Sequence, residues 1–287
     1  MKYSVTTYSF AALMDKGEMT QMDCITRAQE MGFDGIEFSE IVEPAGTTKE
    51  DYAVQLREAC AAAGLAVVNY TFGADFLNGC DGDTAAEIKR VKRHIDIAVL
   101  LGAKSVRHDA TWGSRPSADG YRGFMQVLPI LADACREVTV YAATRGIRTM
   151  VENHGYFCQD SDRVEQLINA VAHPNFGWLV DIGNFLCADE DPILAVGRAI
   201  PYVFHAHAKD FHIKSGDGPN PGEGFFQSRG GNYLRGSIIG HGNAPVTACV
   251  RNLIRNGYDG YLTVEFEGME PCLTGIRLGL EFLKSIG

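Results

Sequence analysis

The sequence lacks the features that mark membrane-spanning, disulfide-linked and zinc-finger proteins. Its eight cysteines are scattered at positions 24, 60, 80, 135, 158, 187, 249 and 272, and no two of them form a CxxC pair. This spacing argues against a disulfide scaffold and a structural zinc site, and it fits a reducing compartment. No uncharged apolar run reaches the roughly 18 residues that a membrane-spanning helix needs. We therefore expect no membrane partner.

The chain is also poor in positive charge and in targeting signals. It has 26 lysines and arginines and 36 aspartates and glutamates, which gives a formal net charge of −10. Neutralising nucleic-acid phosphates takes clustered lysine and arginine, so no nucleic-acid partner is expected. The opening MKYSVTTYSF enters a strand-like alternation at once, without the apolar segment of a signal peptide. A cytoplasmic protein is expected.

What the sequence does contain is a repeated alternation of short β-rich runs with segments of helical spacing. Strands are predicted over 3–9, 35–38, 65–72, 104–109, 147–152, 176–181, 202–207 and 260–266. Helical segments include 20–31, 48–63, 83–101, 119–145, 160–172 and 270–285. Eight strand–helix units in 287 residues predict an α/β fold, a single (β/α)₈ TIM barrel over 1–287. An open dinucleotide-binding sheet is less favoured, because no GxGxxG follows the first strand.

One segment interrupts this alternation. Residues 208–244 are rich in glycine and proline and are too long for an ordinary loop between strand and helix. Loops that follow barrel strands build the active site at the carboxyl ends of those strands. We therefore predict a long, irregular active-site loop at about 208–244, ordered by its aromatic residues and covering the substrate. A disordered insertion is the alternative.

Charged side chains stand at the ends of four successive predicted strands. Glu152 follows MV, Asp181 follows WLV, His207 follows HA and Glu265 follows LTV. A lone charge buried at such a position costs several kcal/mol, and three carboxylates facing one another repel unless a cation lies between them. The set therefore predicts one divalent metal ion. Oxygen-rich ligands with one imidazole favour Mn²⁺, with Mg²⁺ or Co²⁺ as alternatives and Zn²⁺ less favoured.

The motifs VENHG, VDIGN, HAHAKD and TVEFEG, in this order, resemble the xylose isomerase-like TIM-barrel superfamily. That group contains ketose 3-epimerases, sugar isomerases, inosose dehydratases and, more remotely, endonuclease IV. The opening YSF and MGFDGIEF extend the resemblance to essentially the whole chain. It implies that Glu152, Asp181, His207 and Glu265 are the metal ligands and that Lys209 lies near the substrate. A homo-oligomer, dimer or tetramer, is also compatible with it.

The resemblance implies a divalent-metal-dependent sugar isomerase or epimerase. Such an enzyme acts on a ketose or keto-sugar by proton abstraction through a metal-stabilised cis-enediolate. Glu152 and Glu265 are the predicted catalytic residues, one removing the proton and the other returning it. The alternatives are a metal-dependent dehydratase of an inosose or 3-keto-sugar, an endonuclease IV-type nuclease and a sugar-binding barrel without catalysis. The nuclease is less favoured because of the acidity and because Asn184 stands where such proteins carry histidine.

Further side chains near the predicted strand ends could contact the sugar. Arg107, His108, His154 and Lys209 are predicted to bind substrate, and Trp112 could form an apolar wall of the site. 

For other polar residues the sequence favours supporting or surface roles. Asn184 could support the metal ligands, His205 is expected to lie deeper in its strand than His207, and His212 belongs to the loop. Glu267 could replace Glu265 as a ligand. Arg229, Arg235 and His241 in the long loop are expected to be solvated, with binding of a carboxylate or phosphate as the alternative.

Overall fold

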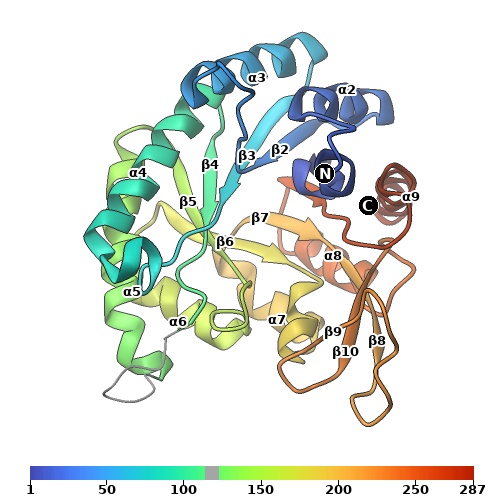
Figure 1. The fold of residues 1–287 in the computed structure, drawn as a ribbon. Helices are drawn as coiled ribbons and strands as arrows, with labels where there is room; N and C mark the ends of the chain where they lie inside the picture. The colour runs from blue at the N-terminus through green and yellow to red at the C-terminus, as the bar shows by residue number, and fades with distance from the viewer. Residues whose placement is uncertain (114–122) are drawn as a thin grey trace.

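The strands of this protein close into a parallel barrel. The structure, a computed structural model, describes residues 1–113 and 123–287. Within them eight parallel strands follow the closed order β1-β11-β7-β6-β5-β4-β3-β2, and helices surround the strands (Figure 1). The predicted (β/α)₈ barrel is confirmed. The chain termini lie side by side in Figure 1, because β1 pairs with β11, the last strand to enter the barrel.

The barrel strands agree with the predicted ranges to within a few residues. They are β1 (Lys2–Thr6), β2 (Gly35–Ser39), β3 (Ala66–Phe72), β4 (Ser105–His108), β5 (Arg148–Glu152), β6 (Phe176–Asp181), β7 (Val203–Ala208) and β11 (Tyr261–Val264). Short apolar and β-branched runs bounded by turn residues account for this agreement, since such runs are typical of buried parallel strands.

The helices include two whose ranges the sequence did not indicate. The longer ones are α2 (Gln21–Met31), α3 (Lys49–Ala63), α4 (Thr84–Leu101), α5 (Phe124–Ala143), α6 (Ser161–Val171), α7 (Pro192–Ala199), α8 (Val246–Arg255) and α9 (Cys272–Ile286). The short ones are α1 (Ala11–Met14) and the 3₁₀ turns η1 (Thr7–Phe10), η2 (Gly79–Gly82), η3 (Asn184–Ala188) and η4 (Ile200–Tyr202). The ranges of α7 and α8 were not predicted, although the eight strand–helix units call for a helix at both places. Residues 119–122 of the predicted helix 119–145 lie outside the described ranges.

None of the helices in the described part of the chain combines the length and the hydrophobicity that crossing a bilayer requires.

Local signals in the sequence fix where several helices begin and end. Thr20 and Asp23 form a capping box at the start of α2, and Asp160 accepts a hydrogen bond from the Arg163 amide at the start of α6. These side chains satisfy amide groups that have no partner within the helix. Gly32 ends α2 with a φ of 76°, a left-handed conformation that costs glycine little.

The segment 208–244 is not irregular throughout, as its composition suggested. It contains an antiparallel sheet of order β8-β10-β9, formed by β8 (Asp210–Lys214), β9 (Phe226–Gln227) and β10 (Tyr233–Ser237), which projects beside the barrel in Figure 1. Phe211 and Leu234 from this sheet pack with Cys187 in a small cluster of buried residues. The glycines and prolines lie mainly between the strands, which is why the composition concealed the sheet.

Asp210 ties the end of this segment to the barrel. Its buried carboxylate accepts hydrogen bonds from the backbone amides of Phe211, Gly240, Gly242 and Ala244, at 2.8–3.0 Å. An ionised acceptor strengthens each of these bonds. Asp210 therefore holds the turn after β10 against the strand that follows β7.

We expect Asp210→Ala to destabilise the protein by about 2–4 kcal/mol, because buried amides left without a partner cost about 1–3 kcal/mol each. Urea denaturation measures the change, and limited proteolysis should show faster cleavage within 208–244. Asp217→Ala is the matched control, since Asp217 is an exposed aspartate of the same segment whose side chain contacts Ser215. Equal stability of the two variants would contradict the anchoring role.

Candidate functional site

The four predicted ligand residues come together at the carboxyl end of the barrel. Glu152 ends β5, Asp181 ends β6, His207 lies near the end of β7 and Glu265 follows β11. Asp181 and His207 are register partners on neighbouring strands. One potential ligand atom from each of the four residues lies within 4.8 Å of those of the other three. The arrangement is a potential metal site.

The environment of Asp181 supports this interpretation. Its side chain is fully buried, and its Oδ2 atom has no hydrogen-bond partner among the described residues. Burial raises the pKa of Asp181 well above its usual value, although Lys209 opposes the shift. An ionised Asp181 therefore requires more positive charge than the described side chains supply. A divalent cation fits this oxygen-rich set of donors.

Lys209 compensates part of the negative charge. Its Nζ lies 3.4 Å from Asp181 Oδ2, 3.1 Å from Glu265 Oε2 and 3.4 Å from Glu267 Oε1. Burial lowers the pKa of Lys209, but these carboxylates outweigh it and hold the pKa well above its usual value. In Glu265 the effect of burial is outweighed by Lys209 and His207, which keep its pKa low. Both groups are therefore charged at neutral pH.

Arg107 and His154 form a second polar group beside the ligands. Arg107 Nε lies 2.7 Å from Glu152 Oε2, and its Nη2 lies 2.8 Å from Asp109 Oδ1. His154 Nδ1 is 2.9 Å from the same Asp109 oxygen. Asn184 donates a hydrogen bond to the other oxygen of Glu152, at 2.9 Å. Asn184 thus contacts a ligand residue, as the sequence suggested, and both oxygens of Glu152 have partners.

A cavity of about 240 Å³ opens above these residues. It is lined by Thr6, Tyr8, Glu37, Ser39, Thr71, Arg107, Trp112, Glu152, His154, His207, Lys209, Glu265 and Glu267. The volume lies below the roughly 300–1,000 Å³ typical of pockets for drug-sized ligands, and it suits a small polar molecule. Trp112 is 55% exposed and packs edge-on against the His154 ring. Three of the four predicted substrate contacts, Arg107, His154 and Lys209, reach this cavity.

The structure does not bring His108 to the cavity. It is adjacent in the strand to Arg107, whose side chain lines the cavity, so the His108 side chain points to the opposite face. There it packs against Phe72 and Phe76, and burial lowers its pKa to about 4. His108 is therefore a neutral histidine packed among aromatic side chains, and it does not line the cavity.

The remaining predicted residues have separate positions. Glu267 lies outside the group of four and contacts Lys209. His212 lies in β8 and is not among the cavity residues. Arg229 is not merely solvated, because it forms an ion pair with Asp160 at 2.9 Å. 

Arg235 stacks over the Phe225 ring and is only partly exposed, with its Nε buried, so the expected solvation is wrong for this residue. His241 is exposed, as expected.

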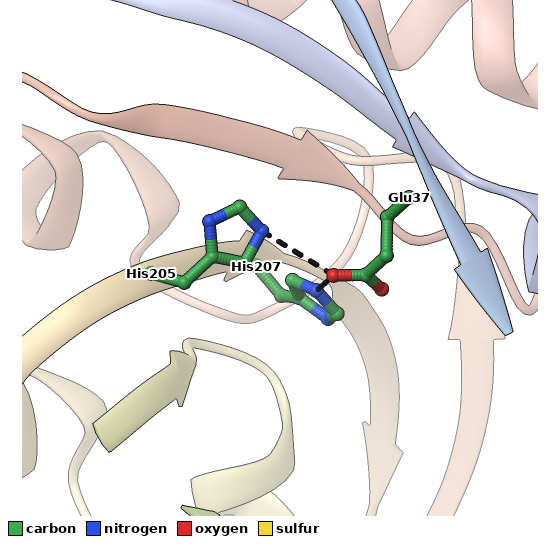
Figure 2. A group of neighbouring side chains, drawn as sticks. All are labelled: Glu37, His205 and His207. Carbon is green, nitrogen blue, oxygen red and sulfur yellow. Dashed lines mark hydrogen bonds and ion pairs between the residues drawn. The ribbon is translucent and has the colours of Figure 1, made fainter. Parts of the chain in front are cut away.

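Two titratable residues that line the cavity, Glu37 and Tyr8, were missed from the sequence. Glu37, in the middle of β2, lies 3.1 Å from His207 Nε2 and 3.4 Å from His205 Nε2 (Figure 2). Tyr8 lines the cavity, and the nearby Glu267 carboxylate, together with burial, raises the pKa of Tyr8 to about 12. Tyr8 is therefore a hydrogen-bond donor at neutral pH. Neither residue stands at a predicted strand end, which was the signal used to find the others.

Comparison with known proteins identifies the family. The model of the xylose isomerase-like TIM barrel family matches residues 25–286. The chain belongs to this family. Among curated proteins, an inosose dehydratase from Geobacillus thermodenitrificans (strain NG80-2) is 24% identical over 266 residues, which cover 90% of this chain and 85% of that protein.

Solved structures of this architecture superpose over the whole length. An L-ribulose 3-epimerase has a TM-score of 0.72 and 15% identity, covering 99% of this chain and 93% of the other. An IOLI protein with a bound zinc atom has a TM-score of 0.76 and 16% identity, covering 100% and 98%. At these identities the likeness establishes the shared fold.

If the four clustered residues hold a metal ion in this xylose isomerase-like protein, His207→Ala should abolish stable binding. The change removes the imidazole donor and leaves three mutually repelling carboxylates. Binding of Mn²⁺ is measured by equilibrium dialysis with elemental analysis. His212→Ala is the matched control and should bind one ion per chain, as the wild type does. Wild-type affinity in His207→Ala would contradict this set of ligands.

Proposed function

We propose that the protein is a divalent-metal-dependent isomerase or epimerase of a ketose or keto-sugar. The observation that carries this proposal is the placement of Glu152 and Glu265 around one small cavity. Strands β6 and β7 separate their strands around the barrel. The two carboxylates therefore enter the cavity from different sides, as a reaction that moves a proton between two faces of a substrate requires.

The donor chemistry supports one metal ion, held by Glu152, Asp181, His207 and Glu265. Mn²⁺ is the proposed ion, because three carboxylates and one imidazole suit hard, octahedral cations. A bound divalent ion supplies a Lewis acid that polarises a ketone and acidifies the neighbouring C–H group. The IOLI relative with its bound zinc atom is consistent with a metal in this fold.

The side chains of the cavity supply the proton transfers. One glutamate removes the proton next to the ketone, which leaves an enediolate. The other glutamate, in its protonated form, returns a proton. Delivery to the opposite face of the same carbon inverts it, and delivery to the adjacent carbon interconverts ketose and aldose. The phenol of Tyr8 and the imidazole of His154 line the same cavity and can hydrogen-bond sugar hydroxyls.

A second candidate, a dehydratase of an inosose or 3-keto-sugar, is favoured by Lys209. Its ammonium group lines the cavity and lies 3.1 Å from Glu265. After Glu265 has removed a proton, it can return that proton to a β-hydroxyl group, which departs as water while Lys209 donates a hydrogen bond to it. The match to an inosose dehydratase over most of both chains supports this candidate.

The charge of the site supports an uncharged substrate. In the described part of the chain, the fixed cations that line the cavity are already paired. Arg107 is in ion pairs with Glu152 and Asp109, and Lys209 lies 3.1–3.4 Å from three carboxylates. A phosphate or carboxylate on the substrate would meet like charge, which costs several kcal/mol.

Proton NMR in D₂O tests the proposed reaction on a panel of ketoses, inososes and 3-keto-glycosides with Mn²⁺ present. Epimerisation or isomerisation should incorporate solvent deuterium into a product that retains all its hydroxyl groups, whereas dehydration releases water. Glu152→Gln and Glu265→Gln should each slow exchange at least about 100-fold, because general acid–base catalysis contributes factors of this size.

Metal content is measured in each of these variants so that loss of the ion is separated from loss of the base. Glu223→Gln changes an exposed glutamate that is not among the cavity residues and serves as the control. Wild-type exchange rates in metal-loaded Glu152→Gln and Glu265→Gln would refute the role of both glutamates.

An uncharged substrate leads to a separate expectation for phosphorylated sugars. For whichever sugar is turned over, the phosphorylated form should show a kcat/KM lower by about two to three powers of ten, since each 1.36 kcal/mol corresponds to a factor of ten. Steady-state kinetics with a matched pair of free and phosphorylated sugars measures this. A preference for the phosphorylated form would contradict the uncharged substrate.

A further inference from the structure

Glu37 faces the side of His207 that is turned away from the other carboxylates. His207 Nδ1 lies 2.9 Å from Glu265 Oε2 and 3.9 Å from Asp181 Oδ2. Its Nε2 lies 3.1 Å from Glu37 Oε2. Figure 2 shows the Glu37 carboxylate reaching from β2 toward the rings of His205 and His207 on β7. The two nitrogens of one imidazole therefore have separate environments.

Glu37 is itself held in place by the neighbouring strand, β3. Asn69 on β3 donates a hydrogen bond to Glu37 Oε2 at 2.9 Å, and Ser105 on β4 donates to Asn69 Oδ1 at 2.8 Å. Glu37 and Asn69 are both fully buried. A carboxylate fixed in this way offers one defined acceptor position to a histidine.

His205 is fixed in the same layer. Its Nε2 lies 2.8 Å from Thr263 Oγ1 on β11, and Thr263 Oγ1 lies 2.7 Å from Ser4 Oγ on β1. His205, two residues before His207 on β7, thus closes a row of buried polar contacts across the barrel. We call this row the polar floor; it comprises Ser4, Glu37, Asn69, Ser105, His205 and Thr263.

We propose that Glu37 is a positioning residue for the metal site, which accepts the Nε2–H of His207 and thereby presents Nδ1 as the ligand nitrogen. The inference rests on the proposed metal-dependent function. A histidine that binds a metal through one nitrogen commonly donates its other N–H to a carboxylate, which fixes the tautomer and the ring orientation. In this chain that carboxylate comes from a strand that contributes no residue to the group of four ligands.

A second metal ion held by Glu37, His205 and His207 is the competing explanation, because their potential ligand atoms also lie within 4.8 Å of one another. Glu37 Oε1 is buried without a hydrogen-bond partner among the described residues. A second ion is less favoured because these atoms already have partners. Glu37 Oε2 accepts a hydrogen bond from Asn69 and contacts His207 Nε2, and His205 Nε2 contacts Thr263. These contacts account for the cluster without an ion.

Two measurements test the proposal with Zn²⁺ as the probe, in the absence of any substrate. In the wild-type protein loaded with one Zn²⁺, ¹⁵N chemical shifts should show His207 bound through Nδ1 and protonated at Nε2. Competition with a chromophoric chelator should show a 10- to 100-fold lower Zn²⁺ affinity in Glu37→Leu, which is the loss that follows removal of such partners. Glu37→Gln keeps an acceptor oxygen and should recover part of the affinity.

Glu267→Gln is the matched control, because it removes a carboxylate that lines the same cavity without contacting His207. It should change the affinity much less than Glu37→Leu. Binding through Nε2, two ions per chain of which one is lost with Glu37, or equal effects of Glu37→Leu and Glu267→Gln would overturn the proposal. The ¹⁵N measurement tests the proposal even if Glu37→Leu fails to fold, because it uses the wild-type protein. A wild-type protein that binds no divalent ion would overturn the proposed function as well.

Discussion

Concentrated negative charge at one end of the barrel is the constraint on which the rest of the site depends. Glu37, Asp109, Glu152 and Asp181 are buried there and Glu265 is largely so, and each of the five lies within 4 Å of Arg107 or His207. Buried charge of one sign is costly unless it is paired and hydrogen-bonded. Arg107, Lys209 and the histidines meet part of this requirement, and a divalent ion would meet the remainder. This excess of negative charge is what makes this end of the barrel a potential metal site.

A layer of buried polar side chains in the barrel interior holds these charged side chains in place. The polar floor links β1, β11, β7, β2, β3 and β4 through side-chain contacts of 2.7–3.4 Å. Buried polar networks of this kind are favourable when their members are satisfied, and they then hold side chains in one arrangement. Glu152, Asp181 and His207 above the floor are carried by strands rather than by loops. Preorganised donors of this kind need little rearrangement during a reaction.

Some site residues could be predicted from the sequence and others could not, and the difference has physical reasons. Strand ends were predictable because apolar runs stop at a polar residue, so Asp181 and His207 stood out. Glu37 did not, since it sits between apolar neighbours in GIEF and its partner His207 is 170 residues away. His108 follows Arg107 directly, and the alternation of a strand places only one of them in the cavity.

The same limits applied outside the barrel. The sheet of β8, β9 and β10 was concealed because glycine and proline dominate the composition of 208–244, while each of its strands is only 2 to 5 residues long. Pairing between such short strands depends on contacts with Cys187, which lies in η3 after β6. A contact between residues that are distant in the sequence cannot be predicted from a local pattern.

The position of β11 between β1 and β7 has a consequence for how the protein is made. During synthesis the N-terminal parts of a chain emerge and begin to fold first. Glu265 and the strand that precedes it, β11, follow all the other barrel strands in the chain and so emerge after them. Until then the barrel has an open seam and one carboxylate is absent from the cluster. The four clustered residues Glu152, Asp181, His207 and Glu265 therefore come together only after β11 has been made.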